Sequence, residues 1–461
     1  MIDIEKLSKT GKFVIGDSSE LVGELHLNAE TTKLTLYTDE CCTYQNVSEI
    51  IGTLHDGTKV TLIDCFNQSS GSIGILIDDV VPPKYENHDF LDTFPRYVIF
   101  GNRHIYATEK VIHEVSFIID DAHNIFYDFD VYGSIHTSTP LIKDIIKKKS
   151  ESIGRDIEVG ENPWIFYYTG KYQIFSVDTE LGVISATHNP KIKFPGVHGI
   201  KVIDSIKLNI TFGMPKTISE AIENIYVLLN FIEIIAGRRQ NVSDLILNLS
   251  NTQERPVQLT VYWCMPPKRD SINDFHIPHP TDIPIQAAIE PEIFGSVLSN
   301  WLKCDEDKRN ARVRYINGIS KGKKYDIDRL IGAANIFDIL IKSKSPREKS
   351  LEAKIIERVG LIKEKVGDYF KDLDIVVKHA VKCRKYYVHG TKTEIDYSKN
   401  PDITVFFTDT LEFIFATSDL IEAGWNMTKW MREATSDGHP FAYFKLSYAY
   451  NLIELKKVLE N

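Results

Sequence analysis

The sequence predicts an α+β fold, in which an N-terminal, mainly antiparallel β domain precedes a C-terminal bundle of helices. In the first half, short apolar runs alternate with polar residues and end at Gly, Asn or Asp, as strands with one buried face do. Proline is dense between Met265 and Pro291, where it would stop helices and interrupt sheets. After Pro291, apolar residues recur at helical spacing.

The strands of the first half are short and separated by turn residues. Leu21–Leu27 and Lys33–Thr38 alternate clearly. His55-Asp56-Gly57-Thr58, between Val47–Leu54 and Lys59–Cys65, predicts a hairpin turn. Many short antiparallel strands predict a sandwich or an open barrel. Further strands are expected at Gly71–Val81, Arg96–Phe100, His113–Ile119, Ile125–Tyr132, Trp164–Tyr168, Lys171–Val177, Lys201–Phe212, Leu245–Leu249 and Gln258–Cys264.

One helix is expected to interrupt these strands. Thr217 and Glu220 have the spacing of a capping box, and apolar residues follow at helical spacing over Ala221–Ile235. Gly237 comes directly after that run and is expected to end the helix.

The proline-rich stretch divides the chain into three parts. We expect a β-rich domain over residues 1–265, a linker over 266–291 and a helical bundle over 292–461. Short connections between its helices are typical of a bundle. Helices are expected at Ile293–Leu302, Asp328–Ile341, Leu351–Tyr369, Asp374–Val388, Ile403–Ala423 and Ala442–Leu459.

Composition limits the classes of function. The chain has 461 residues and a net charge of −10, which disfavours a general nucleic-acid coat. Residues 342–392, however, carry 14 Lys or Arg against 7 Asp or Glu, a local excess that favours a selective contact with an anion or an exposed basic helix face. No apolar run reaches the length of a membrane span, and the N-terminus has no signal-like pattern, so we expect a cytoplasmic protein without a membrane contact. Cysteines and histidines show no zinc spacing, and we expect neither a catalytic metal nor a cofactor.

The strongest candidate for chemistry is Arg384-Lys385-Tyr386-Tyr387-Val388-His389-Gly390. Arginine grips phosphate with two donors, and histidine moves protons near neutral pH. Arginine followed by histidine after four to six residues also occurs at Arg269/His276 and Arg432/His439. Those two pairs lie in the proline-rich stretch and across a turn, where no rigid element fixes their geometry. Only Arg384 and His389 lie on an expected helix, which Gly390 can end.

A helical wheel places Arg384 on an apolar stripe with Val377, Val381 and Val388. An arginine there needs a partner, because an unpaired buried charge is costly. One reading is a structural ion pair, with Asp338 as a candidate partner; the other is an anion site at a helix or subunit interface. Arg384 and His389 lie roughly 140° apart on an ideal helix. Either the helix therefore ends before His389, or two subunits bring their pairs together.

The expected helical bundle with Arg384-x4-His389 resembles the HEPN ribonuclease superfamily. Over most of its length, including Leu21–Leu25 and Ile50–Leu62, the chain resembles ApeA-type abortive-infection proteins, in which a β-rich domain precedes a HEPN domain. Many active members have a small polar residue, often Asn, after the arginine, where this chain has Lys385. Lysine binds phosphate but lacks the paired donor and acceptor of an amide.

The resemblance implies metal-independent cleavage of RNA, with tRNA as one candidate, in a homodimer formed by the HEPN domain. His389 would be the general base and Arg384 would hold the phosphate, giving 2′,3′-cyclic phosphate and 5′-OH ends. An unregulated ribonuclease would harm its host, so the β domain is expected to sense an unknown phage-derived trigger. The residues expected to contact RNA are Lys382, Lys385, Tyr386, Tyr387 and Lys392.

Two other readings remain open. The helical domain could be a non-catalytic dimerisation or interaction module with Arg384 in a structural ion pair, which Lys385 and the acidic net charge favour. The β domain could also bind carbohydrate or peptide through exposed aromatic residues, although no residue spacing points to it.

Overall fold

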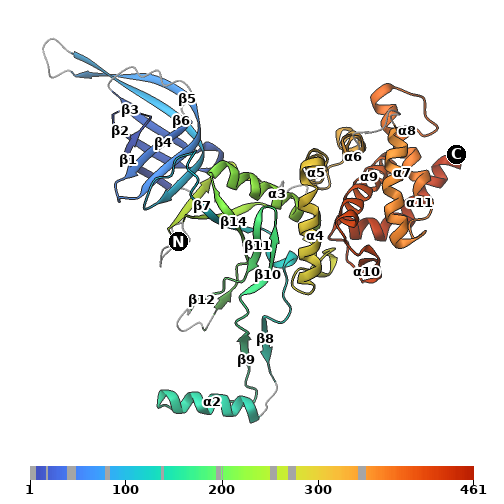
Figure 1. Ribbon diagram of the computed structural model, residues 1–461, viewed down its shortest axis with the longest axis horizontal. Coiled ribbons are helices and arrows are strands. Elements are labelled where there is room, and N and C mark those ends of the chain that lie inside the picture. Colours follow the sequence, from blue (N-terminus) through green and yellow to red (C-terminus); the bar gives the residue numbers. More distant parts are fainter. Residues whose placement is uncertain are drawn as a thin grey trace.

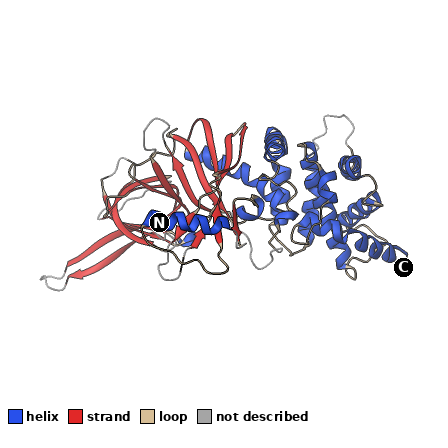
Figure 2. Cartoon of the chain, turned by 90° about the horizontal axis from the view of Figure 1, so that it is seen from below, coloured by secondary structure: helices blue, strands red, loops and turns tan. Residues whose placement is uncertain are grey.

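A computed structural model describes residues 7–16, 19–38, 48–77, 84–136, 140–193, 199, 201–249, 257–267, 277–340 and 349–460. Strands gather at one end of the molecule and most helices at the other (Figure 2). This arrangement confirms the predicted α+β class, with the antiparallel β part first.

Six strands close into a barrel. Hydrogen bonds connect them in the order β6-β3-β2-β1-β4-β5, and β5 pairs again with β6. The barrel encloses its own apolar core, which includes Phe13, Leu36 and Val98. Closure leaves these strands without a free edge, so the barrel is closed, where the sequence suggested a sandwich or an open barrel. The strands are β1 (Leu7–Val14), β2 (Leu21–Leu27), β3 (Lys33–Thr38), β4 (Glu49–Leu54), β5 (Lys59–Ile77) and β6 (Lys84–Gly101).

An open antiparallel sheet continues from the barrel at β6. Its order is β6-β16-β15-β7-β14-β11-β10. Neighbouring residues of β6 serve different cores: Val98 packs inside the barrel, whereas Tyr97 and Ile99 join the core of the open sheet. One strand therefore forms part of both layers. The other strands are β7 (Ile112–Ile119), β10 (Gln173–Thr179), β11 (Gly182–Thr187), β14 (Lys207–Lys216), β15 (Val242–Asn248) and β16 (Gln258–Trp263).

An arm projects from the open sheet (Figure 1). It consists of the paired strands β8 (Tyr132–Ile135) and β9 (Ile165–Tyr168) and of helix α2 (Pro140–Ile153), which the sequence analysis did not predict. The strand predicted at Ile125–Tyr132 is wrong, because the short helix α1 (Ala122–Ile125) and a loop occupy most of that segment. A short apolar run does not by itself distinguish a strand from a buried turn of helix.

The strand predicted over Lys201–Phe212 is divided in two. Its first part, β13 (Lys201–Ile203), pairs with β12 (Lys191–Lys193), and its second part is β14. Asp204 lies between them and accepts hydrogen bonds from the backbone N–H groups of Asn189 and Ser205. Such a side-chain bond competes with sheet pairing and ends the ladder there.

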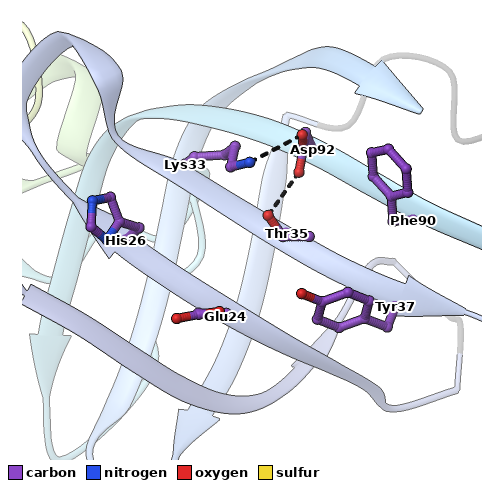
Figure 3. A pocket seen from close by; sticks show the side chains of 7 residues that line it. All are labelled: Glu24, His26, Lys33, Thr35, Tyr37, Phe90 and Asp92. Atoms are coloured by element: carbon purple, nitrogen blue, oxygen red, sulfur yellow. Dashed lines mark hydrogen bonds and ion pairs between the residues drawn. The ribbon is translucent and has the colours of Figure 1, made fainter. Parts of the chain in front are cut away.

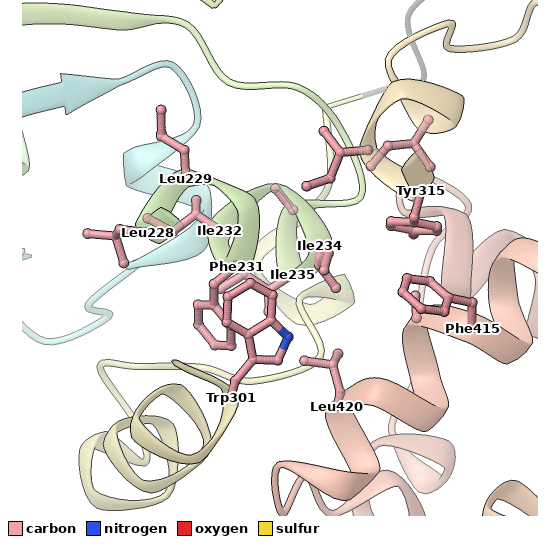
Figure 4. Packing of buried hydrophobic residues seen from close by; sticks show 14 of the residues in the cluster. Leu228, Leu229, Phe231, Ile232, Ile234, Ile235, Trp301, Tyr315, Phe415 and Leu420 are labelled. Atoms are coloured by element: carbon pink, nitrogen blue, oxygen red, sulfur yellow. The ribbon is translucent and has the colours of Figure 1, made fainter. Parts of the chain in front are cut away.

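Helix α3 (Ile218–Ala236) joins the sheet to the helices. Thr217 and Glu220 form the predicted capping box, and Gly237 ends the helix with a φ of 70°. Thirteen of the 19 residues of α3 are buried, including every residue from Phe231 to Ala236. Phe231 of α3 packs against Trp301 with 5.4 Å between ring centroids (Figure 4). The buried second half of α3 packs the bundle against the sheet.

The helical part shares one continuous apolar core with the open sheet. Ile283, Ile285 and Ala287, from the expected linker, are buried in it; the limits at 265 and 292 stay a prediction. The sequence analysis missed two helices, α5 (Asp305–Ile319) and α10 (Met427–Arg432). The polar N-terminal half of α5 weakens its apolar pattern. The helices are α4 (Pro291–Lys303), α5 (Asp305–Ile319), α6 (Ile327–Leu340), α7 (Leu351–Val366), α8 (Leu373–His389), α9 (Pro401–Glu422), α10 (Met427–Arg432) and α11 (Pro440–Glu460).

A buried charge cluster ties α4 and α5 to α9. Asp419 of α9 accepts hydrogen bonds from the indole N–H of Trp301 at 2.8 Å and from Nε of Arg312 at 2.9 Å. Lys308 donates to the same carboxylate at 2.9 Å, and the Arg312 guanidinium lies 3.5 Å from the Trp301 ring centroid. Although burial alone would raise the pKa of Asp419, the charges of Arg312 and Lys308 hold that pKa below its ordinary value.

A half-buried carboxyl of α9 gives a pH-dependent prediction. Asp409 of α9 accepts a hydrogen bond from the Tyr325 hydroxyl at 2.6 Å, and burial raises its pKa from 3.8 to about 7. The folded protein therefore holds this proton more tightly than the unfolded chain between these values, and its stability should fall as pH rises through that window. Urea unfolding of the wild type and of Asp409→Asn, compared from pH 4 to 8, should show a smaller decline in the variant. Asp402→Asn, at an exposed position of α9, is the control; an equal decline in wild type and Asp409→Asn would contradict the prediction.

Candidate active site

Helix α8 carries both candidate catalytic side chains. It runs from Leu373 to His389, and Gly390 ends it with a φ of 65° while its N–H donates to the carbonyl of Tyr386 at 2.9 Å. The predicted role of Gly390 is confirmed. Because His389 is still helical, the alternative in which the helix ends before His389 is wrong.

The apolar stripe of α8 is buried at its beginning and open at its end. Val377 and Val381 are buried in the core, Arg384 is partly buried, and Val388 is exposed. Arg384 therefore lies where the packed interior of the bundle meets its surface. A guanidinium at such a boundary can be held by the protein on one side and meet an anion on the other.

Asn335 of α6 holds the Arg384 side chain. Nη2 of Arg384 donates to Oδ1 of Asn335 at 3.1 Å, while its buried Nε has no hydrogen-bond partner among the described residues. Within the described chain no carboxylate lies at ion-pair distance from Arg384. Asp338, the candidate partner, pairs instead with Lys354 at 2.8 Å. The sequence analysis missed Asn335, although the need of Arg384 for a partner was its signal.

His389 is exposed, and its ring makes no hydrogen bond within the described part of the chain. It lies one turn beyond Arg384 and on another face of α8. A single subunit thus has one partly buried cation and one exposed imidazole, roughly 140° apart around an ideal helix.

The residues expected to contact RNA surround the end of α8. Lys385 and Lys392 are exposed, whereas Lys382 forms an ion pair with Glu394 at 3.2 Å. Tyr386 is exposed, whereas Tyr387 packs partly against the core. The ring centroids of Tyr386 and Tyr387 are 5.0 Å apart. Lys385, Tyr386 and Lys392 are thus accessible, and Tyr387 is mainly a packing residue.

Of the two other Arg/His pairs, Arg432/His439 lies within the described residues. His439 is fully buried; its Nδ1 accepts from the N–H of Phe441 and its Nε2 donates to the carbonyl of Ile235 at 2.9 Å. Burial lowers its pKa to about 4, so the ring is neutral and structural. The pair Arg269 and His276 lies outside the described residues.

The described segments contain no group of three or more His, Cys, Asp or Glu side chains arranged to hold a metal ion. None of the helices in these segments is both long enough and apolar enough to cross a membrane.

Two known families match the chain, over ranges that overlap at residues 290–301. The family described as ApeA N-terminal domain 1 matches residues 8–301, which include the barrel, the open sheet, α3 and α4. The family described as Apea-like HEPN matches residues 290–429, which include α8 with Arg384 and His389. No curated protein and no solved structure matches the chain.

Proposed function

Because this chain belongs to the ApeA-type HEPN family, whose two domains suggest an anti-phage defence protein, we propose that it is a ribonuclease that cleaves RNA with Arg384 and His389. One observation carries the proposal. Among the described residues, the guanidinium of Arg384 is anchored by the Asn335 amide with no carboxylate at ion-pair distance, and His389, whose ring has no hydrogen-bond partner there, lies at the end of the same helix.

The proposed reaction is an internal transfer at phosphorus. His389 removes the proton of a ribose 2′-OH, and the resulting oxyanion attacks the adjacent phosphorus atom. The bond to the 5′-oxygen of the next nucleotide breaks, and that oxygen takes up a proton. Arg384 stabilises the charge that grows on the non-bridging oxygens. The products are a 2′,3′-cyclic phosphate and a 5′-OH.

The proposed active unit is a homodimer. Because Arg384 and His389 point from different faces of α8, a two-fold pair of helices would bring two of each into one cleft. The partner subunit's His389 could then protonate the leaving oxygen. Lys385 and Lys392 are proposed to contact the RNA backbone and Tyr386 an unpaired base, with tRNA as one candidate substrate.

Product analysis tests the reaction class. We expect the purified protein to leave 2′,3′-cyclic phosphate and 5′-OH ends on a mixed pool of tRNA, with full activity in EDTA. Products with 5′-phosphate ends, or loss of cleavage in EDTA, would contradict this mechanism and indicate a different reaction.

Asn335 is proposed to position Arg384. Asn335→Ala should lower cleavage roughly fivefold, because the Arg384 guanidinium loses one net hydrogen bond of about 1 kcal/mol and becomes free to rotate. The readout is kcat and KM for a short RNA, with Asn317→Ala, an exposed amide on α5, as the matched control. Equal rates for both variants would contradict the role of Asn335.

The second candidate is a non-catalytic dimerisation or interaction module. Lys385, in the position where many active members have a small polar residue, favours it. In that case the purified chain would form dimers and leave RNA intact. The β domain is proposed in either case to receive an unknown phage-derived trigger.

A further inference from the structure

A polar groove lies on the outer wall of the barrel, far along the chain from Arg384. It has a volume of about 470 Å³ and lies over β2, β3 and β6 (Figure 3). This size suits a small ligand of one or a few rings. The groove is lined by Glu24, His26, Lys33, Thr35, Tyr37, Phe90 and Asp92.

Asp92 is the fixed polar group of this groove. It is 8% exposed and accepts hydrogen bonds from Thr35 at 2.7 Å, Lys33 at 3.2 Å and Ser69 at 3.1 Å. Although burial would raise the pKa of Asp92, these hydrogen bonds hold that pKa below its ordinary value. A carboxylate has about four acceptor positions, so Asp92 is held in place with room for one further donor.

Two aromatic rings form the other end of the groove. Tyr37 and Phe90 are directly opposite each other on β3 and β6. The ring of Phe90 lies over Gly71, where a Cβ would come within 3.0 Å of it. Gly71 therefore lets this ring lie close against the sheet, and Tyr37 beside it is exposed. Exposed ring faces of this kind pack against the apolar face of a ligand ring.

The free hydrogen-bonding groups in the groove mix donors with acceptors. Lys33 keeps two of its three donors, and Glu24, which accepts from Ser8 through Oε1, keeps Oε2. His26 makes no hydrogen bond within the described residues. A phosphate only accepts and an ammonium only donates, whereas each sugar hydroxyl does both. The mixed set matches a ligand with several hydroxyl groups.

We propose that this groove binds a neutral saccharide, with one sugar ring stacked on Tyr37 and Phe90 and its hydroxyl groups bonded to Asp92, Lys33 and Glu24. The groove contains two carboxylates, Glu24 and Asp92, and one lysine, Lys33, which is already paired with Asp92. This charge balance disfavours binding of the RNA backbone. Addition of a peptide strand is disfavoured as well, because β2, β3 and β6 have both edges paired inside the closed ring.

A glycan array and saturation-transfer NMR with the full-length protein test the proposal. At least one neutral oligosaccharide on the array should bind, and its ring protons should receive saturation from the protein. Tyr37→Ala should weaken that binding about tenfold or more, since aromatic packing contributes about 1 kcal/mol beyond buried area. Asp92→Asn, which keeps the side-chain volume and removes the negative charge, should weaken binding of the oligosaccharide too.

The matched control is Phe66→Ala, which removes an exposed ring on β5 outside the groove and should bind as the wild type does. An array on which no neutral glycan binds, or equal binding by Tyr37→Ala and wild type, would overturn the proposal. Tighter binding of a single-stranded RNA that depends on Tyr37 would assign the groove to nucleic acid instead. RNA cleavage by Tyr37→Ala should be unchanged, which keeps this test separate from that of the nuclease site.

Discussion

The His389→Ala protein is expected to fold normally and to cleave RNA at least about a hundredfold more slowly than the wild type. Loss of a general base typically costs between about 10² and 10⁴ in rate. The side chain is exposed and makes no hydrogen bond within the described chain, so its removal should not affect folding. Initial rates on one RNA, with thermal unfolding of the same sample, measure both quantities.

Arg384 calls for a more conservative substitution, because part of its side chain is buried. Arg384→Gln keeps much of the aliphatic stem and an amide that can reach Asn335, but it removes the positive charge. It should be as inactive as His389→Ala and nearly as stable as the wild type. His55→Ala, an exposed histidine in a barrel turn, controls for loss of an imidazole. Full cleavage by either active-site variant would end the assignment, and loss of folding in Arg384→Gln would favour the non-catalytic module.

The Asp419→Ala protein is expected to lose about 3–5 kcal/mol of stability, because removing one partner of a buried ion pair leaves an uncompensated charge. Arg312 is fully buried and keeps only Asp305 as a carboxylate partner at 3.1 Å, while the Trp301 N–H loses its acceptor. The free energy of unfolding in urea gives the cost.

A surface ion pair provides the comparison for Asp419. Glu454→Ala removes the exposed partner of Lys457 and should cost less than about 1 kcal/mol. A similar small cost for Asp419→Ala would mean that the cluster contributes only specificity.

Local signals were enough to predict the elements that depend on neighbouring residues. The bounds of β2 and β3 follow from strict alternation, and the ends of α3 follow from Thr217 and Gly237. Gly390 likewise predicted the end of α8. Each of these depends on interactions within one or two turns of chain.

Contacts between distant residues could not be predicted in the same way. The barrel closes through β5 and β6, a pairing that alternation in either strand does not specify. Asn335 lies 49 residues from Arg384, and an apolar stripe shows only that some partner is needed. Helix α5 was missed because two of its buried positions, Asp305 and Arg312, carry charge. Arg312 pairs with Asp305 of the same helix and with Asp419 of α9, and the sequence does not show the second partner.

The two cores that meet at β6 have a mechanical consequence. Val98 faces the interior of the barrel, and its neighbours Tyr97 and Ile99 face the interior of the open sheet. A slip of β6 by one residue would exchange the two sets of side chains and expose both interiors at once. The register of β6 is therefore fixed by both cores at once. The barrel and the open sheet cannot slide past one another along β6, and a displacement of β6 would move both as one rigid unit.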